Sequence, residues 1–166
     1  MTVKKNRIIV VTVMAAILIV LIGWIVWGNT ALEQTVYSVS SPQIPTTFDG
    51  YRIAHVSDLH NTQMGPENEK LLAMLRDAQP DMIAITGDLV DSRNTDMDVA
   101  LQFAEAACRI APCYYVPGNH ESRIGEYDVL KNGLLEAGVI VLEDTSIEIK
   151  SSEEKILLFG VRDPNF

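Results

Sequence analysis

The feature that most constrains this chain is an uninterrupted apolar run near its amino terminus. From Ile8 to Trp27 there is no charged side chain, and only Thr12 and Gly23 depart from a purely apolar character. In a helix that rises ~1.5 Å per residue, these twenty residues span roughly 30 Å, which is the hydrocarbon thickness of a bilayer. We therefore predict a transmembrane helix at residues 8–27.

The residues that flank the run indicate how it crosses the membrane. Basic residues crowd its amino-terminal side, and tryptophans stand at its far end, where amphipathic rings favour the headgroup layer. The basic residues are Lys4, Lys5 and Arg7, and the tryptophans are Trp24 and Trp27. By the positive-inside rule, residues 1–7 form a cytoplasmic tail and the chain after Asn29 lies outside. The prediction is a single-pass cell-membrane protein with an extracytoplasmic domain.

A cleaved signal peptide is the competing interpretation of the same run. The segment Asn29-Thr30-Ala31 is where a small-residue cleavage site would lie. However, the run is longer than the ~7–15 apolar residues of a signal peptide, and no Ala-x-Ala follows it. The pattern therefore favours an anchor.

Beyond the apolar run the chain is strongly acidic. All 22 acidic residues lie after residue 27, together with ten of the 13 basic residues, which gives this part a net charge of −12. Such a surface repels nucleic acid and anionic lipid headgroups, so we expect no nucleic-acid binding. It suits a domain that collects divalent cations, although solubility alone accounts for most acidic surfaces.

The chain has two cysteines, Cys108 and Cys113. An external location would permit a disulfide between them. The flanking elements would have to distort to bring the two Cβ atoms together, so we interpret both as small buried hydrophobes.

After a polar stalk at residues 28–48, strand and helix patterns alternate. Expected strands are 52–57, 82–86, 113–116, 139–142, 147–150 and 155–160, and expected helices are 67–78, 96–110 and 127–137, the last closed by Gly138. Strands that alternate with helices form βαβ units. We therefore predict an α/β fold with a mostly parallel sheet covered on both faces.

Polar residues of one chemical kind follow each of the first three expected strands. The segments are Asp58-Leu59-His60, Gly87-Asp88-Leu89-Val90-Asp91 and Gly118-Asn119-His120-Glu121. Each is weak alone, because Gly-Asp after a strand is most often a turn. Together they stand beyond the carboxyl ends of consecutive parallel strands, where α/β sheets bind ligands. Their side chains are therefore expected to converge.

Carboxylates, imidazole and an amide oxygen suit Mn²⁺, Fe or Zn²⁺ better than a metal that prefers soft ligands. A carboxylate between two cations can bridge them. Two cations ~3.5–4 Å apart can hold the attacking and leaving oxygens of an in-line displacement. The chemistry that this set implies is phosphoester hydrolysis.

In their order, these three motifs resemble those of the calcineurin-like metallophosphoesterases. The flanking segments resemble the membrane-anchored bacterial branch of that family: Phe48-Asp49-Gly50-Tyr51-Arg52-Ile53, Ser92-Arg93 and Gly160-Val161-Arg162-Asp163-Pro164. The resemblance runs from about Ser40 to the last residue. It implies a two-sheet sandwich flanked by helices.

The resemblance also implies metal ligands. Asp58 and His60 would bind the first of two divalent metal ions, which would be Mn, Fe or Zn. Asp88 would bridge the two ions, and Asn119 would bind the second. The alternative for Asp88 taken alone is a helix cap, and for His60 a surface histidine.

Around these ligands the resemblance implies three supporting roles. His120 would be a catalytic general acid or charge stabiliser and not a ligand, Glu121 would orient its imidazole, and Asp91 would support the site from behind the ligands. Carboxylates in loops commonly serve only as caps or solvated charge, which is the open alternative for Glu121 and Asp91. The remaining histidine, His55, lies inside the first strand, and we interpret it as a core residue.

Two later segments of the family pattern, a Gly-His and a Gly-His-x-His, do not occur, because His120 is the last histidine. We therefore expect residues 49–166 to be a partial metallophosphoesterase domain, truncated at its carboxyl end. This would be the first half of the two-sheet sandwich. A sheet without its partner would expose a large apolar patch.

The predicted function is metal-dependent hydrolysis of phosphomonoesters or phosphodiesters by a hydroxide that two metal ions activate. The location makes lipid-linked or cell-envelope phosphoesters candidate substrates. The alternative is a non-catalytic, membrane-anchored remnant that binds metal or a phosphorylated ligand. A third interpretation is a structural surface module whose acidic loops cap helices.

Overall fold

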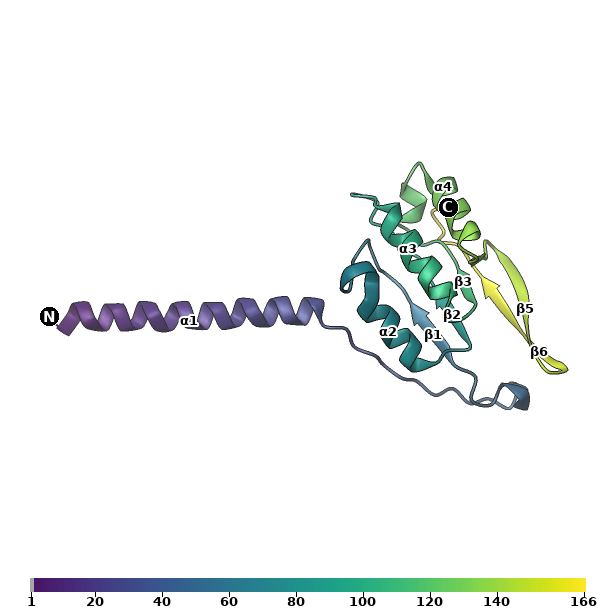
Figure 1. Ribbon diagram of the computed structural model, residues 1–166, viewed down its shortest axis with the longest axis horizontal. Helices are drawn as coiled ribbons and strands as arrows, with labels where there is room; N and C mark the ends of the chain where they lie inside the picture. Colours follow the sequence, from purple (N-terminus) through teal and green to yellow (C-terminus); the bar gives the residue numbers. More distant parts are fainter. Residues whose placement is uncertain (1) are drawn as a thin grey trace. The chain divides into compact units, whose positions relative to one another are not determined.

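The computed structural model describes residues 2–166, and the chain divides into two units, Met1–Thr35 and Val36–Phe166. The first unit contains helix α1 (Thr2–Thr30) (Figure 1). Its residues Asn6–Ile25 have a mean hydropathy of 3.0, so the helix is long and apolar enough to cross a membrane. This agrees with the predicted apolar helix.

The second unit is an α/β fold, as predicted (Figure 1). Four strands form a parallel sheet in the order β1-β2-β3-β4: β1 (Ile53–Val56), β2 (Met82–Ile85), β3 (Cys113–Tyr115) and β4 (Ile140–Val141). Three helices connect them: α2 (Glu69–Ala78), α3 (Met97–Cys108) and α4 (Tyr127–Glu136). Short 3-10 helices are η1 (Thr46–Phe48), η2 (Pro66–Asn68) and η3 (Glu121–Arg123). Strands β5 (Thr145–Ser151) and β6 (Glu154–Gly160) form a separate antiparallel hairpin.

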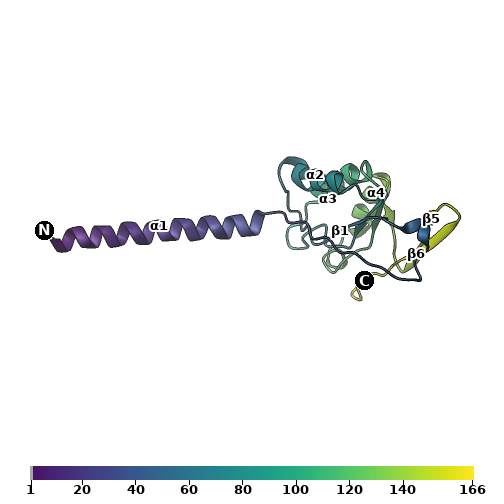
Figure 2. The ribbon, with the colours of Figure 1, turned by 90° about the horizontal axis from the view of Figure 1, so that it is seen from below.

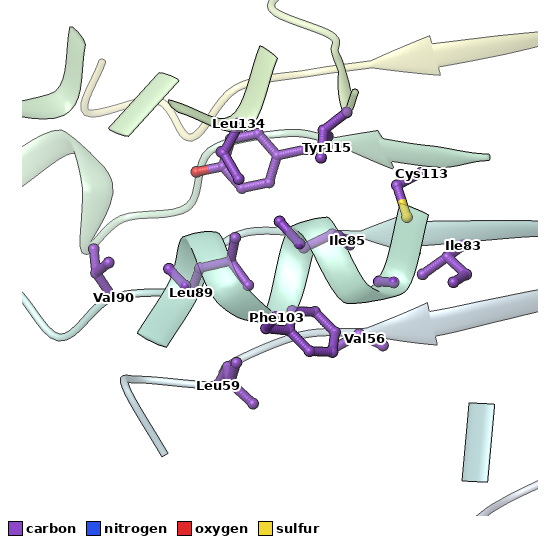
Figure 3. Close-up of a cluster of buried hydrophobic side chains, with 14 of the residues drawn as sticks. Val56, Leu59, Ile83, Ile85, Leu89, Val90, Phe103, Cys113, Tyr115 and Leu134 are labelled. Atoms are coloured by element: carbon purple, nitrogen blue, oxygen red, sulfur yellow. The ribbon is translucent and has the colours of Figure 1, made fainter. Parts of the chain in front are cut away.

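The core lies between the helices and one face of the parallel sheet. Alternate strand residues, such as Ile85 and Tyr115, belong to the same buried cluster as Phe103 of α3 and Leu134 of α4 (Figure 3). All four are 0–1% exposed. Fully burying a side chain of this size stabilises a fold by roughly 1.5–3 kcal/mol, so this layer fixes the sheet on which the motif loops stand.

Among the described residues no helix packs on the opposite face of the sheet, which is partly open although Met82 there is 1% exposed, and this corrects the prediction that both faces are covered. Figure 2 shows the three helices together on one side of the sheet. On the other face, His55 and Thr86 are exposed, and Tyr114 is half-buried. The interpretation of His55 as a core residue is therefore wrong. Its neighbour Val56 takes the position that faces the helices, and the His55 Nε2 atom instead lies 2.6 Å from the Thr86 Oγ1 atom.

The β5–β6 hairpin also exposes apolar side chains. Leu157 and Phe159 on β6 are 55% and 64% exposed. At its end, β6 approaches the parallel sheet so closely that only a glycine fits. A Cβ atom on Gly160 would lie 2.2 Å from the Cβ atom of Leu142 and 2.7 Å from the Cγ1 atom of Val116.

The end of helix α4 and the state of the two cysteines agree with what the sequence predicts. Gly138 ends α4 with a φ of 91°, a conformation that glycine adopts without strain, and its N–H donates to the Leu135 carbonyl. Cys108 and Cys113 are free thiols, as predicted. Cys113 is buried but Cys108 only half-buried, and this burial raises the pKa of both thiols.

The tight contact at Gly160 gives a stability prediction. We expect Gly160→Ala to lower the free energy of unfolding by about 1–3 kcal/mol, because the added methyl group overlaps two neighbouring side chains. Urea unfolding of the detergent-solubilised chain would measure the change. Gly125→Ala is the matched control, since a Cβ atom there meets nothing within 4 Å. Equal stabilities of the two variants would contradict the packing described.

Candidate metal centre

The three motif loops lie side by side because the strands that precede them are paired. The segment after β1 forms backbone hydrogen bonds with the segment after β2. The N–H of Asp58 donates to the Gly87 carbonyl at 3.2 Å, and the N–H of His60 donates to the Asp88 carbonyl at 2.9 Å. The polar residues of the first two motifs are thus brought together by backbone pairing.

Apolar residues within the motifs anchor the same loops. Leu59 is 4% exposed, and Leu89 and Val90 are both 0% exposed. All three belong to the buried cluster under the sheet edge (Figure 3). The alternation of polar and apolar residues in the motifs therefore has a physical reason: the apolar residues fix the loops, and the polar ones are left at the surface of the core.

The loop backbone at this edge is strained. Asp58, His60, Asn61 and Asp88 have φ values of 57°, 48°, 60° and 53°, in the left-handed region that side chains other than glycine seldom adopt. Such residues cost about 1–3 kcal/mol each and persist where the surroundings dictate the conformation. A cluster of them at one sheet edge is typical of a functional site.

The loops after β2 and β3 touch backbone to backbone. A Cβ atom on Gly87, whose φ is 87°, would lie 2.3 Å from the Gly118 nitrogen. A Cβ atom on Gly118 would lie 2.4 Å from the Asp88 Oδ1 atom. Both positions require glycine, and this contact brings Asp88 next to the residues that follow Gly118.

Three side chains from the three loops could hold one metal ion. Ligand atoms of His60, Asp88 and His120 all lie within 4.8 Å of one another. The His60 Nε2 atom is 3.6 Å from the Asp58 Oδ1 atom and 4.0 Å from the Asp88 Oδ2 atom. Asp88 is only 8% exposed. The predicted convergence of Asp58, His60 and Asp88 is therefore present in the structure.

Asn119 completes the oxygen-rich edge. Its side-chain amide lies between the Asp88 Oδ2 atom, at 3.0 Å, and the guanidinium of Arg123, at 3.0 and 3.2 Å. With its nitrogen toward Asp88, the amide donates to the carboxylate and accepts from Arg123. With its oxygen toward Asp88, two oxygens would meet, an arrangement that a cation between them stabilises. The position thus suits the predicted ligand role of Asn119.

The imidazole of His120 is oriented by the segment after the second motif. Its Nδ1 atom accepts the backbone N–H of Ser92 at 3.0 Å and lies 3.3 Å from the Ser92 hydroxyl. A backbone N–H can only donate, so Nδ1 must carry the lone pair and the neutral ring must carry its proton on Nε2. Distance alone would admit His120 as a metal ligand. The Ser92 hydrogen bond argues instead for a hydrogen-bond donor, because an Nε2 atom that carries a proton cannot bind a metal.

Asp91 lies beside the same ring. Its Oδ1 atom is 3.5 Å from the His120 Nδ1 atom. Hydrogen bonds from the Arg93 side chain and backbone hold the pKa of the Asp91 carboxyl well below its usual range. The carboxylate is thus kept charged by Arg93 next to the imidazole, and its supporting role stays a prediction.

Glu121 has a different position from the one predicted. Its carboxylate is fully buried and accepts hydrogen bonds from the backbone N–H groups of four residues. These residues are Asp88, Leu89, Val90 and Gly118. Among the described residues, the Nδ1 atom of His120 is contacted by Ser92 and Asp91. The prediction that Glu121 orients the imidazole is therefore corrected.

Sequence reasoning missed two contributors to this site. Ser92 entered the sequence argument only as a flank of the family motif, although its backbone N–H orients His120. Arg123 was not singled out, and it contacts Asn119 because η3 turns the chain back immediately after His120. No signal in the sequence marked Arg123.

The side chains fit a hard divalent cation. Two carboxylates, an imidazole and an amide converge, with the His60 Nε2 atom toward both carboxylates. Against known proteins, the family model for calcineurin-like phosphoesterases matches residues 51–159, which contain all three motif loops. The chain belongs to the calcineurin-like phosphoesterase family.

Two curated relatives of this chain carry the family name. The Bacillus subtilis metallophosphoesterase YkoQ is 31% identical over 116 residues, which are 67% of this chain and 43% of the relative. A Danio rerio transmembrane protein with a metallophosphoesterase domain is 26% identical over 165 residues, 92% of this chain and 36% of the relative. The chain thus spans less than half the length of these relatives.

A solved structure also resembles this chain. The crystal structure of the phosphopantetheinyl hydrolase of Mycobacterium tuberculosis is similar with a TM-score of 0.49 and 22% sequence identity, over 66% of this chain and 41% of that chain.

The Ser92 hydrogen bond predicts the tautomer of His120. In the metal-free chain, we expect the neutral His120 ring to carry its proton on Nε2. Long-range ¹H–¹⁵N correlation spectra distinguish the two ring nitrogens, with His120→Gln identifying the signals. A ring protonated on Nδ1 would show that the Ser92 N–H does not donate to it.

Proposed function

We propose that this chain forms part of a metal-dependent site that hydrolyses phosphoesters outside a membrane. The observation that carries the proposal is the convergence of Asp58, His60, Asp88 and Asn119 from three consecutive strand ends, with His120 beside them. Family membership supports it, because calcineurin-like phosphoesterases are hydrolases of phosphoesters.

The ligand roles follow from what each side chain offers. Asp58 and His60 would hold one divalent ion, Asp88 would be shared between two, and Asn119 would hold the second, with Mn, Fe and Zn as the candidate metals. When bound, such ions supply Lewis-acid activation of water and neutralise phosphoryl charge. The left-handed backbone at Asp58 and Asp88 presents both carboxylates at the sheet edge before any metal arrives.

His120 would stabilise the charge that develops in the reaction. With Nδ1 accepting the Ser92 N–H, the ring presents Nε2–H as a hydrogen-bond donor, which suits an oxygen that gains negative charge as a phosphoester bond breaks. The Asp91 Oδ1 atom, held by Arg93, lies 3.5 Å from the Nδ1 atom of the ring. The ring would thus act as charge stabiliser, with Asp91 beside it.

The coordination that this chain supplies is partial. Three of its side chains would reach the first ion and two the second, which is short of a filled site. The chain spans 43% and 36% of two curated relatives. We propose that the remaining ligands come from polypeptide outside these 166 residues, so that the described part is the first half of the catalytic domain.

The partial ligand set also favours a second candidate, a membrane-anchored remnant that binds metal without catalysis. His55, His60 and His120 are the only histidines in the sequence, and His55 lies on the open face of the sheet. Under this alternative the chain binds a divalent ion and hydrolyses nothing.

One experiment separates these functions. We expect the full 166-residue chain in detergent to bind Mn²⁺ by calorimetry and to hydrolyse bis(p-nitrophenyl) phosphate with Mn²⁺ only slowly, because its ligand set is partial. Asp88→Asn should weaken both by at least about 100-fold, because it removes the carboxylate shared by the two ions. Asp98→Asn, an exposed position on α3, is the matched control.

Each outcome favours a different candidate function. Mn²⁺ binding that depends on Asp88, without hydrolysis, would favour the non-catalytic remnant. Absence of divalent-metal binding by the wild-type chain would contradict both functions and favour a structural module.

We further propose that α1 anchors the domain with its amino terminus in the cytoplasm. The basic residues before the span support this orientation through the positive-inside rule. An external site on a membrane-anchored chain would meet lipid-linked or cell-envelope phosphoesters, which are therefore the proposed substrate class.

Labelling in intact cells tests this orientation. Ser152 lies exposed in the turn of the β5–β6 hairpin, so we expect Ser152→Cys to react with a membrane-impermeant maleimide. The wild-type chain is the control, because Cys113 is buried and Cys108 half-buried. Labelling of Ser152→Cys only after the cells are lysed would place the domain in the cytoplasm.

A further inference from the structure

We propose that Glu121 is a positioning residue whose buried carboxylate binds in a nest of backbone N–H groups and thereby holds the two loops of the metal centre at their working distance. This inference rests on the proposed function, because the loops in question carry Asp88, Asn119 and His120. It assigns Glu121 no contact with substrate or metal.

The hydrogen bonds of Glu121 reach both loops. Its Oε1 atom accepts the N–H of Leu89 at 2.8 Å and that of Val90 at 3.4 Å. Its Oε2 atom accepts the N–H of Asp88 and the N–H of Gly118, each at 2.8 Å. One carboxylate oxygen therefore joins the loop after β2 directly to the loop after β3.

The loop after β2 has the form of an anion-binding nest. Successive N–H groups of residues 88–90 point at one place, in a turn where Gly87 and Asp88 have φ values of 87° and 53°. Concave sites of this kind bind phosphates and other anions in many proteins. Here the protein's own Glu121, 0% exposed, fills the nest. The N–H groups are thus committed to the fold and withheld from substrate.

A carboxylate is the side chain that this nest requires. Burying a charged group is costly unless hydrogen bonds compensate for the lost water, and four N–H donors to two oxygens do so. A glutamine has the same shape but only one acceptor oxygen. Its NH₂ group would face N–H donors and leave buried donors unsatisfied.

The position of the metal ligands depends on this junction. Asp88, the residue whose N–H contacts Glu121, also accepts the N–H of His120 on its Oδ1 atom at 2.8 Å. Asn119 follows Gly118, the other residue held by the same glutamate oxygen. Loss of the carboxylate would therefore let Asp88 and Asn119 move apart while the strands stay paired.

Metal affinity tests the proposal with a readout other than catalysis. In the full chain in detergent, we expect Glu121→Gln to weaken Mn²⁺ binding by about 10–100-fold, as removal of groups that orient ligands does. Calorimetry and the electron paramagnetic resonance of free Mn²⁺ would measure it, with circular dichroism to verify the fold. Glu126→Gln, an exposed glutamate before α4, is the matched control.

Chemical rescue by acetate is a second test of the role of the Glu121 carboxylate. Glu121→Ala leaves the nest vacant, so added acetate should enter it and recover at least about tenfold of the lost Mn²⁺ affinity. Wild type and Glu121→Gln, whose nests are filled, should show no such gain. A variant that is merely destabilised would not recover with a small carboxylate.

Mn²⁺ affinity of Glu121→Gln equal to that of Glu126→Gln would overturn the proposal and leave the proposed function intact. If the Glu121 variants do not fold, amide hydrogen exchange of the wild-type chain decides. The N–H groups of Asp88, Leu89 and Gly118 should then exchange slowly although they lie in loops, and exchange at the unprotected rate would overturn the proposal. A wild-type chain that binds no Mn²⁺ but protects these amides would contradict the function and support the nest.

Discussion

The backbone contact between Gly87 and Gly118 is the constraint on which the rest of this site depends. Parallel strands bring their carboxyl ends to one edge, but neighbouring strands alone leave the loops free to diverge. Here two glycines without side chains let the loops meet, so that a Cβ atom at Gly87 would lie 2.3 Å from the Gly118 nitrogen. The Glu121 carboxylate then spans the junction. Asp88 and Asn119 become neighbours as a result of this packing.

The same junction explains where strain is tolerated. Left-handed conformations at Asp58, His60 and Asp88 would each be costly in a free loop. They persist because the side chains of Leu59 and Leu89 are buried in the core, and because backbone hydrogen bonds join the loop after β1 to the loop after β2. The core thus supplies the free energy that holds polar side chains in a converged arrangement, and the fold is tied to the chemistry through these apolar anchors.

The sequence predicted those features that depend on local pattern. The α/β class and parallel sheet followed from periodicity, and helices α2, α3 and α4 lie within the predicted ranges, because apolar spacing and the stop signals at Pro80 and Gly138 are local. The convergence of the motif side chains followed from strand topology. His55 was misjudged because a parallel sheet was assumed to be covered twice, which no local pattern reports.

Glu121 was misjudged for a different reason. Its partners are backbone N–H groups, and these carry no residue identity, so the sequence next to Glu121 pointed to the adjacent imidazole instead. Ser92 shows the same limit, since its contribution to His120 comes from a backbone N–H. The sequence indicates which side chains meet at the strand ends. It does not indicate which of these side chains already accept hydrogen bonds from backbone N–H groups.

That distinction decides which acidic groups remain for a cation. Asp91 is paired with Arg93 through both oxygens, and the two oxygens of Glu121 are filled by N–H groups. Asp58 and Asp88 instead face the His60 ring, whose Nε2 atom lies 3.6 Å from the Asp58 Oδ1 atom and 4.0 Å from the Asp88 Oδ2 atom, and neither carboxylate forms an ion pair with arginine or lysine among the described residues. Two carboxylates beside one ring, without arginine or lysine partners, concentrate negative charge at this edge of the sheet. A divalent cation there would neutralise this charge, so the electrostatics of the edge suit the proposed metal site.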